Sequence, residues 1–220
     1  LVKQAPPEGQ ADLRISLLEQ HGLVSRSMGD MRQAVDDFMS WAECAHASGN
    51  LTEEVDALFH LASARSWFDR EQCLATVEQG IALSAQLRDE ALRIDMGGRA
   101  AYWRLLWDKW RDEDALACAQ AVASARRSGV RSHLGFHVRR LTYFQALQAR
   151  YGEACRAAEE GMQIALEEGD ASEYLTGLFF WAWTLLHHGQ WGELRRLLGE
   201  GLRLAERNGH RQWATLFRLE

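Results

Sequence analysis

The chain has 220 residues, of which 47% are hydrophobic and 25% are charged, as in folded rather than disordered proteins. Its formal net charge is −6, with 31 acidic against 25 basic residues. This balance argues against direct DNA or RNA binding, because phosphate recognition needs clustered Lys and Arg. The longest apolar run, residues 174–186, is too short and too mixed to span a bilayer, and no secretion signal is recognisable. We therefore expect a cytoplasmic protein.

The N-terminal residues differ in character from the rest of the chain. Both prolines of the sequence, Pro6 and Pro7, lie there. We expect a flexible N-terminal segment over residues 1–10, followed by a single helical repeat domain over 11–220. Because proline is what most strongly interrupts a helix, everything after Pro7 is free to be helical.

A 40-residue repeat runs through this domain. Alanine and glycine recur in register, with Asp89 in the one gap of the glycine series: Ala45, Ala85, Ala125, Ala165 and Ala205; Gly49, Gly129, Gly169 and Gly209. Self-similarity at such a period is the signature of a solenoid. The units are residues 11–50, 51–90, 91–130, 131–170 and 171–210, with a partial sixth at 211–220, which suggests an excised piece of a longer protein.

Each unit contains two amphipathic helical patterns separated by a turn, so each is predicted to be a helical hairpin. No segment alternates with the period of a strand. The fold class is therefore all-α, a right-handed α-α superhelix (solenoid) of about five helical hairpins plus a partial sixth. The recurring glycines are expected to be helix C-caps, and Asp30 with Gln33 and Asp170 with Glu173 have capping-box spacing.

The alanine column is expected to lie where the two helices of a hairpin approach most closely, because only a small side chain fits there. Gly161 and Gly201, with Ala121 in the same column, extend this small stripe by one turn.

Units four and five share a large–small–aromatic pattern. Unit four reads Val138, Leu141, Thr142, Gln145, Ala149, Tyr151, Ala154, Ala158 and Gly161; unit five reads Leu178, Trp181, Ala182, Leu185, Gly189, Trp191, Leu194, Leu198 and Gly201. The spacing resembles that of tetratricopeptide repeats. The period of 40 instead of 34, the missing closing proline, and Trp41 and Tyr102 at small positions depart from that family.

Longer units of this kind are similar to the superhelical repeat region of large bacterial signal-transduction ATPases and transcription regulators. That resemblance implies sensing of an effector or partner. The sequence itself has no P-loop and no helix-turn-helix motif, so neither ATP binding nor DNA binding is assigned to it.

The tetratricopeptide resemblance implies that the first helix of each unit lines a concave groove. One column then reads Ser63, Trp103, Tyr143 and Trp183, and the column one turn earlier reads Phe59, Arg99, Arg139 and Phe179. Further predicted groove residues enlarge the surface: Met96, Phe136, Trp67, Trp107 and His187.

Such a surface suits an extended peptide with apolar and acidic side chains, because Trp, Tyr and Arg dominate binding energy at interfaces. It would also stack a sugar or another flat ligand. An equally weighted alternative is that the aromatic residues are mainly core. Arg99 and Arg139, as stacked like charges, require either an anionic partner or nearby carboxylates.

No catalytic, metal or cofactor site is expected. His133 and His137 share a helix face, but no carboxylate or cysteine at helix spacing completes a metal site with them. The four cysteines are widely spaced and are interpreted as small buried thiols. No GxSxG nucleophile signature occurs.

We therefore predict a non-catalytic protein- or peptide-interaction scaffold, a fragment of a larger bacterial regulatory protein. The alternative is a small-ligand (effector) sensing module of a signal-transduction ATPase or transcription regulator. A third possibility is self-association through the exposed terminal helix, residues 211–220.

Overall fold

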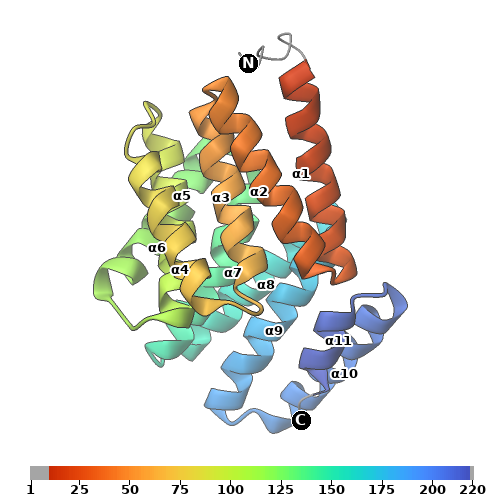
Figure 1. The fold of residues 1–220 in the computed structure, drawn as a ribbon. Coiled ribbons are helices and arrows are strands. Elements are labelled where there is room, and N and C mark those ends of the chain that lie inside the picture. Colours follow the sequence, from red (N-terminus) through yellow and green to blue (C-terminus); the bar gives the residue numbers. More distant parts are fainter. Residues whose placement is uncertain (1–9, 219–220) are drawn as a thin grey trace, which may run out of the picture. The chain divides into compact units, whose positions relative to one another are not determined.

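The protein is all-α, and the computed structural model describes residues 10–218, with no strand among them (Figure 1). The helices in this range are α1 (Gln10–Met28), α2 (Met31–Ser48), α3 (Leu51–Arg65), α4 (Arg70–Ser84), α5 (Glu90–Trp107), α6 (Asp112–Ser128), α7 (Arg131–Leu147), α8 (Tyr151–Glu168), α9 (Ala171–His188), α10 (Trp191–Arg207) and α11 (Arg211–Phe217). None of these helices is long and apolar enough to cross a membrane. The predicted flexible segment 1–10 lies outside the described residues except for Gln10, which begins α1.

The chain forms two compact units, Leu1–Trp110 and Arg111–Glu220, which are described separately. The first contains α1 to α5 and the second α6 to α11. The predicted repeat unit 91–130 is divided between them, since it contributes α5 to one and α6 to the other. A single domain over 11–220 therefore stays a prediction.

The helix boundaries follow the 40-residue register. First helices of successive hairpins begin at residues 10, 51, 90, 131, 171 and 211. The N-cap half of both predicted capping boxes is confirmed, because the carboxylates of Asp30 and Asp170 accept hydrogen bonds from the backbone N–H groups of Gln33 (3.1 Å) and Glu173 (2.9 Å). The other half differs, because the backbone N–H groups of Asp30 and Asp170 donate to the carbonyls of Ser25 and Ala165. The four predicted C-cap glycines all have positive φ, between 71° and 73°. These signals set the ends of the helices.

The alanine column is buried in four of the five units, at Ala45, Ala125, Ala165 and Ala205. Ala85 was expected to be buried with them and is exposed instead. The reason is that α4 ends at Ser84, leaving Ala85 as its C-cap, while Asp89 caps the start of α5. The small column one turn earlier is confirmed: a Cβ added at Gly201 would lie 2.5 Å from the Phe217 ring.

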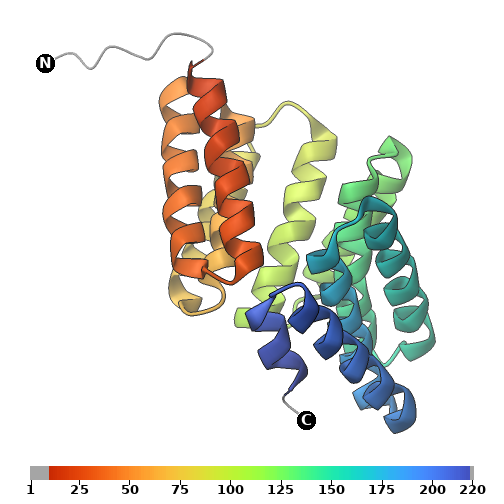
Figure 2. The same ribbon diagram turned by 90° about the vertical axis from the view of Figure 1, so that its right-hand side faces the viewer.

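In the first unit, α1 to α4 pack in sequence around a shared core (Figures 1 and 2). Phe38 and Trp41 of α2 are fully buried there. Trp41, which departs from the tetratricopeptide pattern, donates its indole N–H to Glu53 of α3 at 3.0 Å. The large side chain is therefore accommodated by a hydrogen bond between hairpins.

In the second unit, α7 to α10 form two hairpins, and α11 packs on α10 (Figure 1). The core includes Leu175, Leu178 and Leu197. Ala214 and Phe217 of α11 are buried in the same cluster. These two side chains of the terminal helix therefore pack on their own chain, and self-association through residues 211–220 stays a prediction.

Candidate functional site

The twelve predicted groove residues divide equally between the two units. The first unit holds Phe59, Trp67, Met96, Arg99, Trp103 and Trp107; the second holds Phe136, Arg139, Tyr143, Phe179, Trp183 and His187. The predicted aromatic strip of Trp103, Tyr143 and Trp183 is divided in the same way, with Trp103 in the first unit. Tyr143 and Trp183 lie in the second unit.

Three of the six predicted residues in the first unit are core. Phe59 and Met96 are 3% exposed and Trp103 is 7% exposed. The Trp103 ring packs edge-on against the Tyr102 ring, with centroids 4.6 Å apart. Trp107 is half-buried and Trp67 is exposed. Phe59, Met96 and Trp103 are therefore closed to a ligand.

Arg99 joins two helices of the first unit through carboxylates. Its Nε donates to Asp95 on the same helix at 2.9 Å, and its Nη1 donates to Asp56 of α3 at 2.8 Å. The guanidinium is neutralised within the fold. The sequence predicted that either an anionic partner or nearby carboxylates would neutralise Arg99. The structure has nearby carboxylates.

Arg139 is buried more deeply, at 2% exposure. Its Nε and Nη2 lie 2.9 Å and 2.7 Å from the Glu173 carboxylate, and its Nη1 donates to the Gly161 carbonyl at 3.0 Å. The arginine of α7 therefore ties α8 and α9 together. It is a structural ion pair, and the predicted role in binding an acidic ligand finds no support here.

Glycines make the space for this arginine. A Cβ added at Gly161 would lie 2.5 Å from Arg139 Cγ, and one added at Gly135 would lie 2.9 Å from its Nη1. Gly177 on α9 is also adjacent, with 3.5 Å to Arg139 Cδ. Small residues on three helices thus form the cradle of one guanidinium.

Phe136 is engaged by its neighbours on α7. The Arg140 guanidinium carbon lies 3.3 Å from the Phe136 ring centroid, a cation–π contact. The Phe136 ring also packs edge-on against His137 at 5.1 Å. Phe136 is half-buried, and both of these ring contacts are with residues of its own helix.

Phe179 is directed toward the terminal helix. Its ring lies 6.0 Å from that of Trp213 and 6.5 Å from that of Phe217. It packs against the core cluster of the second unit. Phe179 therefore contributes to the docking of α11 more than to a groove.

An aromatic surface remains on α7 and α9. The rings of Tyr143 and Trp183 lie 4.6 Å apart, and the rings of Trp183 and His187 lie 4.0 Å apart. Tyr143 and Trp183 are half-buried, and His187 is exposed. We call Tyr143, Trp183 and His187 the α7–α9 aromatic surface. It is the part of the predicted strip that the structure brings together with its rings accessible.

The i, i+4 spacing places Trp183 and His187 on one face of α9, next to Tyr143 on α7. Phe180 supports the surface from behind, with its ring 5.6 Å from that of Tyr143 and only 3% exposed. Burial raises the pKa of the Tyr143 hydroxyl, so the group stays protonated and can donate a hydrogen bond. The surface offers flat rings and a hydrogen-bond donor.

Of the four cysteines, which were predicted to be buried thiols, Cys73 and Cys118 are buried, whereas Cys44 and Cys155 are half-buried. Burial raises the pKa of the Cys73 and Cys118 thiols to about 12, and it also raises that of Cys155. For these three cysteines, the thiolate that nucleophilic or metal chemistry requires is therefore disfavoured. Within residues 10–218 no group of three His, Cys, Asp or Glu side chains is placed to hold a metal ion.

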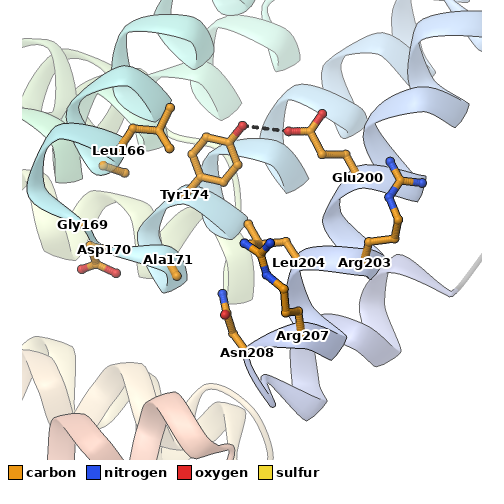
Figure 3. A pocket seen from close by; sticks show the side chains of 11 residues that line it. Leu166, Gly169, Asp170, Ala171, Tyr174, Glu200, Arg203, Leu204, Arg207 and Asn208 are labelled. Atoms are coloured by element: carbon orange, nitrogen blue, oxygen red, sulfur yellow. Dashed lines mark hydrogen bonds between the residues drawn. The ribbon is translucent and has the colours of Figure 1, made fainter.

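Sequence reasoning missed an open pocket of 590 Å³ in the second unit. Figure 3 shows its lining, which comes from the end of α8, the first turn of α9 and the last turns of α10. The signal available in the sequence was Arg203 and Arg207, four residues apart on α10 and so on one helix face. Both arginines lie on the second helix of a hairpin, outside the first-helix columns that were predicted to line a groove.

No protein-family model matches the chain, and no curated protein matches it in sequence. Similarity to solved structures is clear but remote. The chain is similar to the apo form of RapI (TM-score 0.55, 9% identity, 94% of this chain) and to aspartyl phosphate phosphatase F from Bacillus subtilis (TM-score 0.57, 11% identity, 94% of this chain). It spans 58% and 55% of the length of those two proteins.

It is also similar to a kinesin light chain protein of Podosopora anserina with nearly identical TPR-like repeats. The TM-score is 0.54 at 15% identity, covering 93% of this chain and 98% of the other. At these identities the likeness concerns the fold. The chain is therefore a tetratricopeptide-like array of helical hairpins, as its sequence predicted.

Proposed function

We propose that this chain is a non-catalytic protein- or peptide-interaction module whose binding surface is the α7–α9 aromatic surface. The observation that carries the proposal is the accessible cluster of the Tyr143, Trp183 and His187 rings, with centroids 4.6 Å and 4.0 Å apart. Helical repeat arrays present such extended surfaces to partners. Tyr and Trp are also enriched among the residues that dominate interface energies.

The internal pairing of the arginines refines the expected ligand. Arg99 and Arg139 are both bound to carboxylates of their own unit, so neither supplies a free cation. We therefore expect a peptide with apolar or aromatic side chains, bound by stacking and hydrophobic burial, rather than an acidic one.

Membership of a larger bacterial regulator, and a cytoplasmic location, complete the proposal. The resemblance to the repeat regions of signal-transduction ATPases and transcription regulators motivates the first. The free cysteines of the described chain fit a reducing compartment. An effector-sensing role is the alternative. Binding of a small effector would depend on one enclosed pocket, whereas binding of a peptide would depend on several aromatic side chains in a row.

The test selects random dodecamer peptides by phage display on the whole chain and measures their affinity by calorimetry. Trp183→Ala should weaken binding roughly thirtyfold, which corresponds to a hot-spot loss of about 2 kcal/mol. Tyr143→Ala should weaken it less, because the remaining indole still stacks.

Trp191→Ala is the matched control. Trp191 lies in the same unit and is 59% exposed, but it begins α10 and is not part of the aromatic surface. Selected peptides that bind Trp183→Ala as tightly as wild type, or that lose equal affinity with Trp191→Ala, contradict the proposal. Circular dichroism confirms that each variant is folded.

A further inference from the structure

We propose that the pocket between α8, α9 and α10 is a second binding site, specific for a small organic anion with an apolar body. It lies in the second unit and does not depend on the aromatic surface for its argument. Its volume of 590 Å³ falls within the range of about 300–1,000 Å³ found for small-molecule sites.

The walls of the pocket are apolar. Leu166 of α8 is 58% exposed at its edge, and Leu204 of α10 is half-buried. The Tyr174 ring lies between them, as Figure 3 shows. A ligand body of aromatic or aliphatic carbon would cover this exposed surface and gain from its removal from water.

The acidic groups of the pocket are already engaged. Glu200 accepts a hydrogen bond from the Tyr174 hydroxyl at 2.8 Å and one from Arg196 at 3.1 Å. The Asp170 carboxylate accepts from the backbone of Glu173, where it caps α9. Each carboxylate is therefore directed at a partner belonging to the fold.

The basic groups of the pocket differ from these carboxylates. The two acidic residues three positions from Arg203 on α10 are Glu200 and Glu206, and they pair with Arg196 and Arg218 respectively. Arg207 has no acidic residue three or four positions away in the sequence. No hydrogen bond or ion pair engages Arg203 or Arg207 among the described residues.

The ligand class follows from this combination. Two guanidinium groups on one helix face are left without compensating charge beside an apolar pocket. Guanidinium binds carboxylate with paired, charge-assisted hydrogen bonds. Figure 3 shows Arg207 extending from α10 toward the start of α9, so that a carboxylate could reach it while the ligand body covers Leu204 and Tyr174.

The test titrates the whole chain, labelled with ¹⁵N, with naphthalene-1-acetate and with its neutral amide. The two probes share one body and differ in charge. We expect saturable binding of the carboxylate, with backbone amide shifts at Leu166, Tyr174 and Arg207. The neutral amide should bind at least about fivefold more weakly, as expected for the loss of a partly exposed charge-assisted contact.

The variants are Arg203→Gln with Arg207→Gln, compared with Arg195→Gln. Arg195 is exposed on the same helix but does not line the pocket. The double variant should lose the preference for the anion, whereas the control should keep it within about twofold. Equal binding of the two probes, shifts confined to other surfaces, no saturable binding, or an equal effect of Arg195→Gln would each overturn the proposal.

Binding of peptides at the aromatic surface is read separately, by the Trp183→Ala variant. Failure of that proposal leaves the pocket titration unchanged, because the aromatic surface is not among the residues that line the pocket. Conversely, loss of probe binding in the arginine double variant with intact peptide binding would identify the pocket as an independent site.

Discussion

Replacing Glu173 with glutamine should destabilise the second unit strongly. The substitution keeps the shape of the side chain but removes the charge that neutralises Arg139, which is 2% exposed. Two charge-assisted contacts, at 2.9 Å and 2.7 Å, become ordinary ones. A loss of about 1–1.5 kcal/mol for each gives about 2–3 kcal/mol in the free energy of unfolding. Breaking a buried pair outright costs about 3–5 kcal/mol.

The assay is urea unfolding followed by circular dichroism, with the midpoint and the slope recorded. Glu167→Gln is the matched control, because Glu167 pairs with Arg131 where both side chains are about half exposed. Exposed pairs contribute less than about 1 kcal/mol. Equal losses for the two variants would refute the interpretation of Arg139 and Glu173 as a buried structural pair.

A second substitution separates lost charge from lost packing. Arg139→Met, added to Glu173→Gln, removes the more closely paired of the two guanidinium groups, those of Arg139 and Arg140, that the Glu173 carboxylate contacts. Because the cost of the single variant arises from a buried uncompensated cation, the double variant should recover part of it. A double variant that is destabilised by the sum of two independent losses would contradict this account.

Two further predictions concern the core. Ala165→Leu should lower the free energy of unfolding by about 1–3 kcal/mol, because Ala165 is 1% exposed and a larger side chain would overpack its site. Urea unfolding measures this change. A variant as stable as wild type would count against the repeat register. At about pH 8.5, Cys73 and Cys118 should resist Ellman's reagent in the native protein and react with it in guanidinium chloride. The reason is that unfolded thiols ionise near that pH, whereas burial raises the pKa of these two thiols to about 12. Between about pH 8.5 and pH 12, rising pH should therefore lower the free energy of unfolding, because the unfolded thiols ionise and the folded ones do not. Rapid reaction of both thiols in the native protein would contradict their burial.

The sequence was sufficient for the repeat and for most helix ends because those depend on local chemistry. Asp30 and Asp170 cap helices through their own neighbours, and the C-cap glycines need only a positive φ. Ala85 shows the limit of the register. There α4 ends at Ser84, Asp89 caps the next helix, and the alanine is exposed despite its place in the column.

The candidate site was harder to predict because equivalent positions have different surroundings. Phe179 and Trp183 lie one turn apart on α9, yet Phe179 packs near the rings of Trp213 and Phe217 of α11. Trp183 instead packs against Tyr143 and stays half-buried. The sequence spacing predicts that both residues lie on one face of the helix. Which neighbouring helix covers each of them depends on tertiary packing, which the spacing does not reveal.

The burial of Arg139 changes the chemistry that the aromatic surface can offer. A free arginine beside Tyr143 and Trp183 would favour an acidic ligand, whereas the Glu173 carboxylate already occupies this guanidinium on two of its nitrogens. An acidic peptide would have to displace that carboxylate from a guanidinium that is 2% exposed, and breaking such a buried pair is costly. Stacking on neutral rings carries no such penalty. Selectivity for anions therefore belongs to Arg203 and Arg207 at the pocket, while the α7–α9 aromatic surface should discriminate by shape and apolar content.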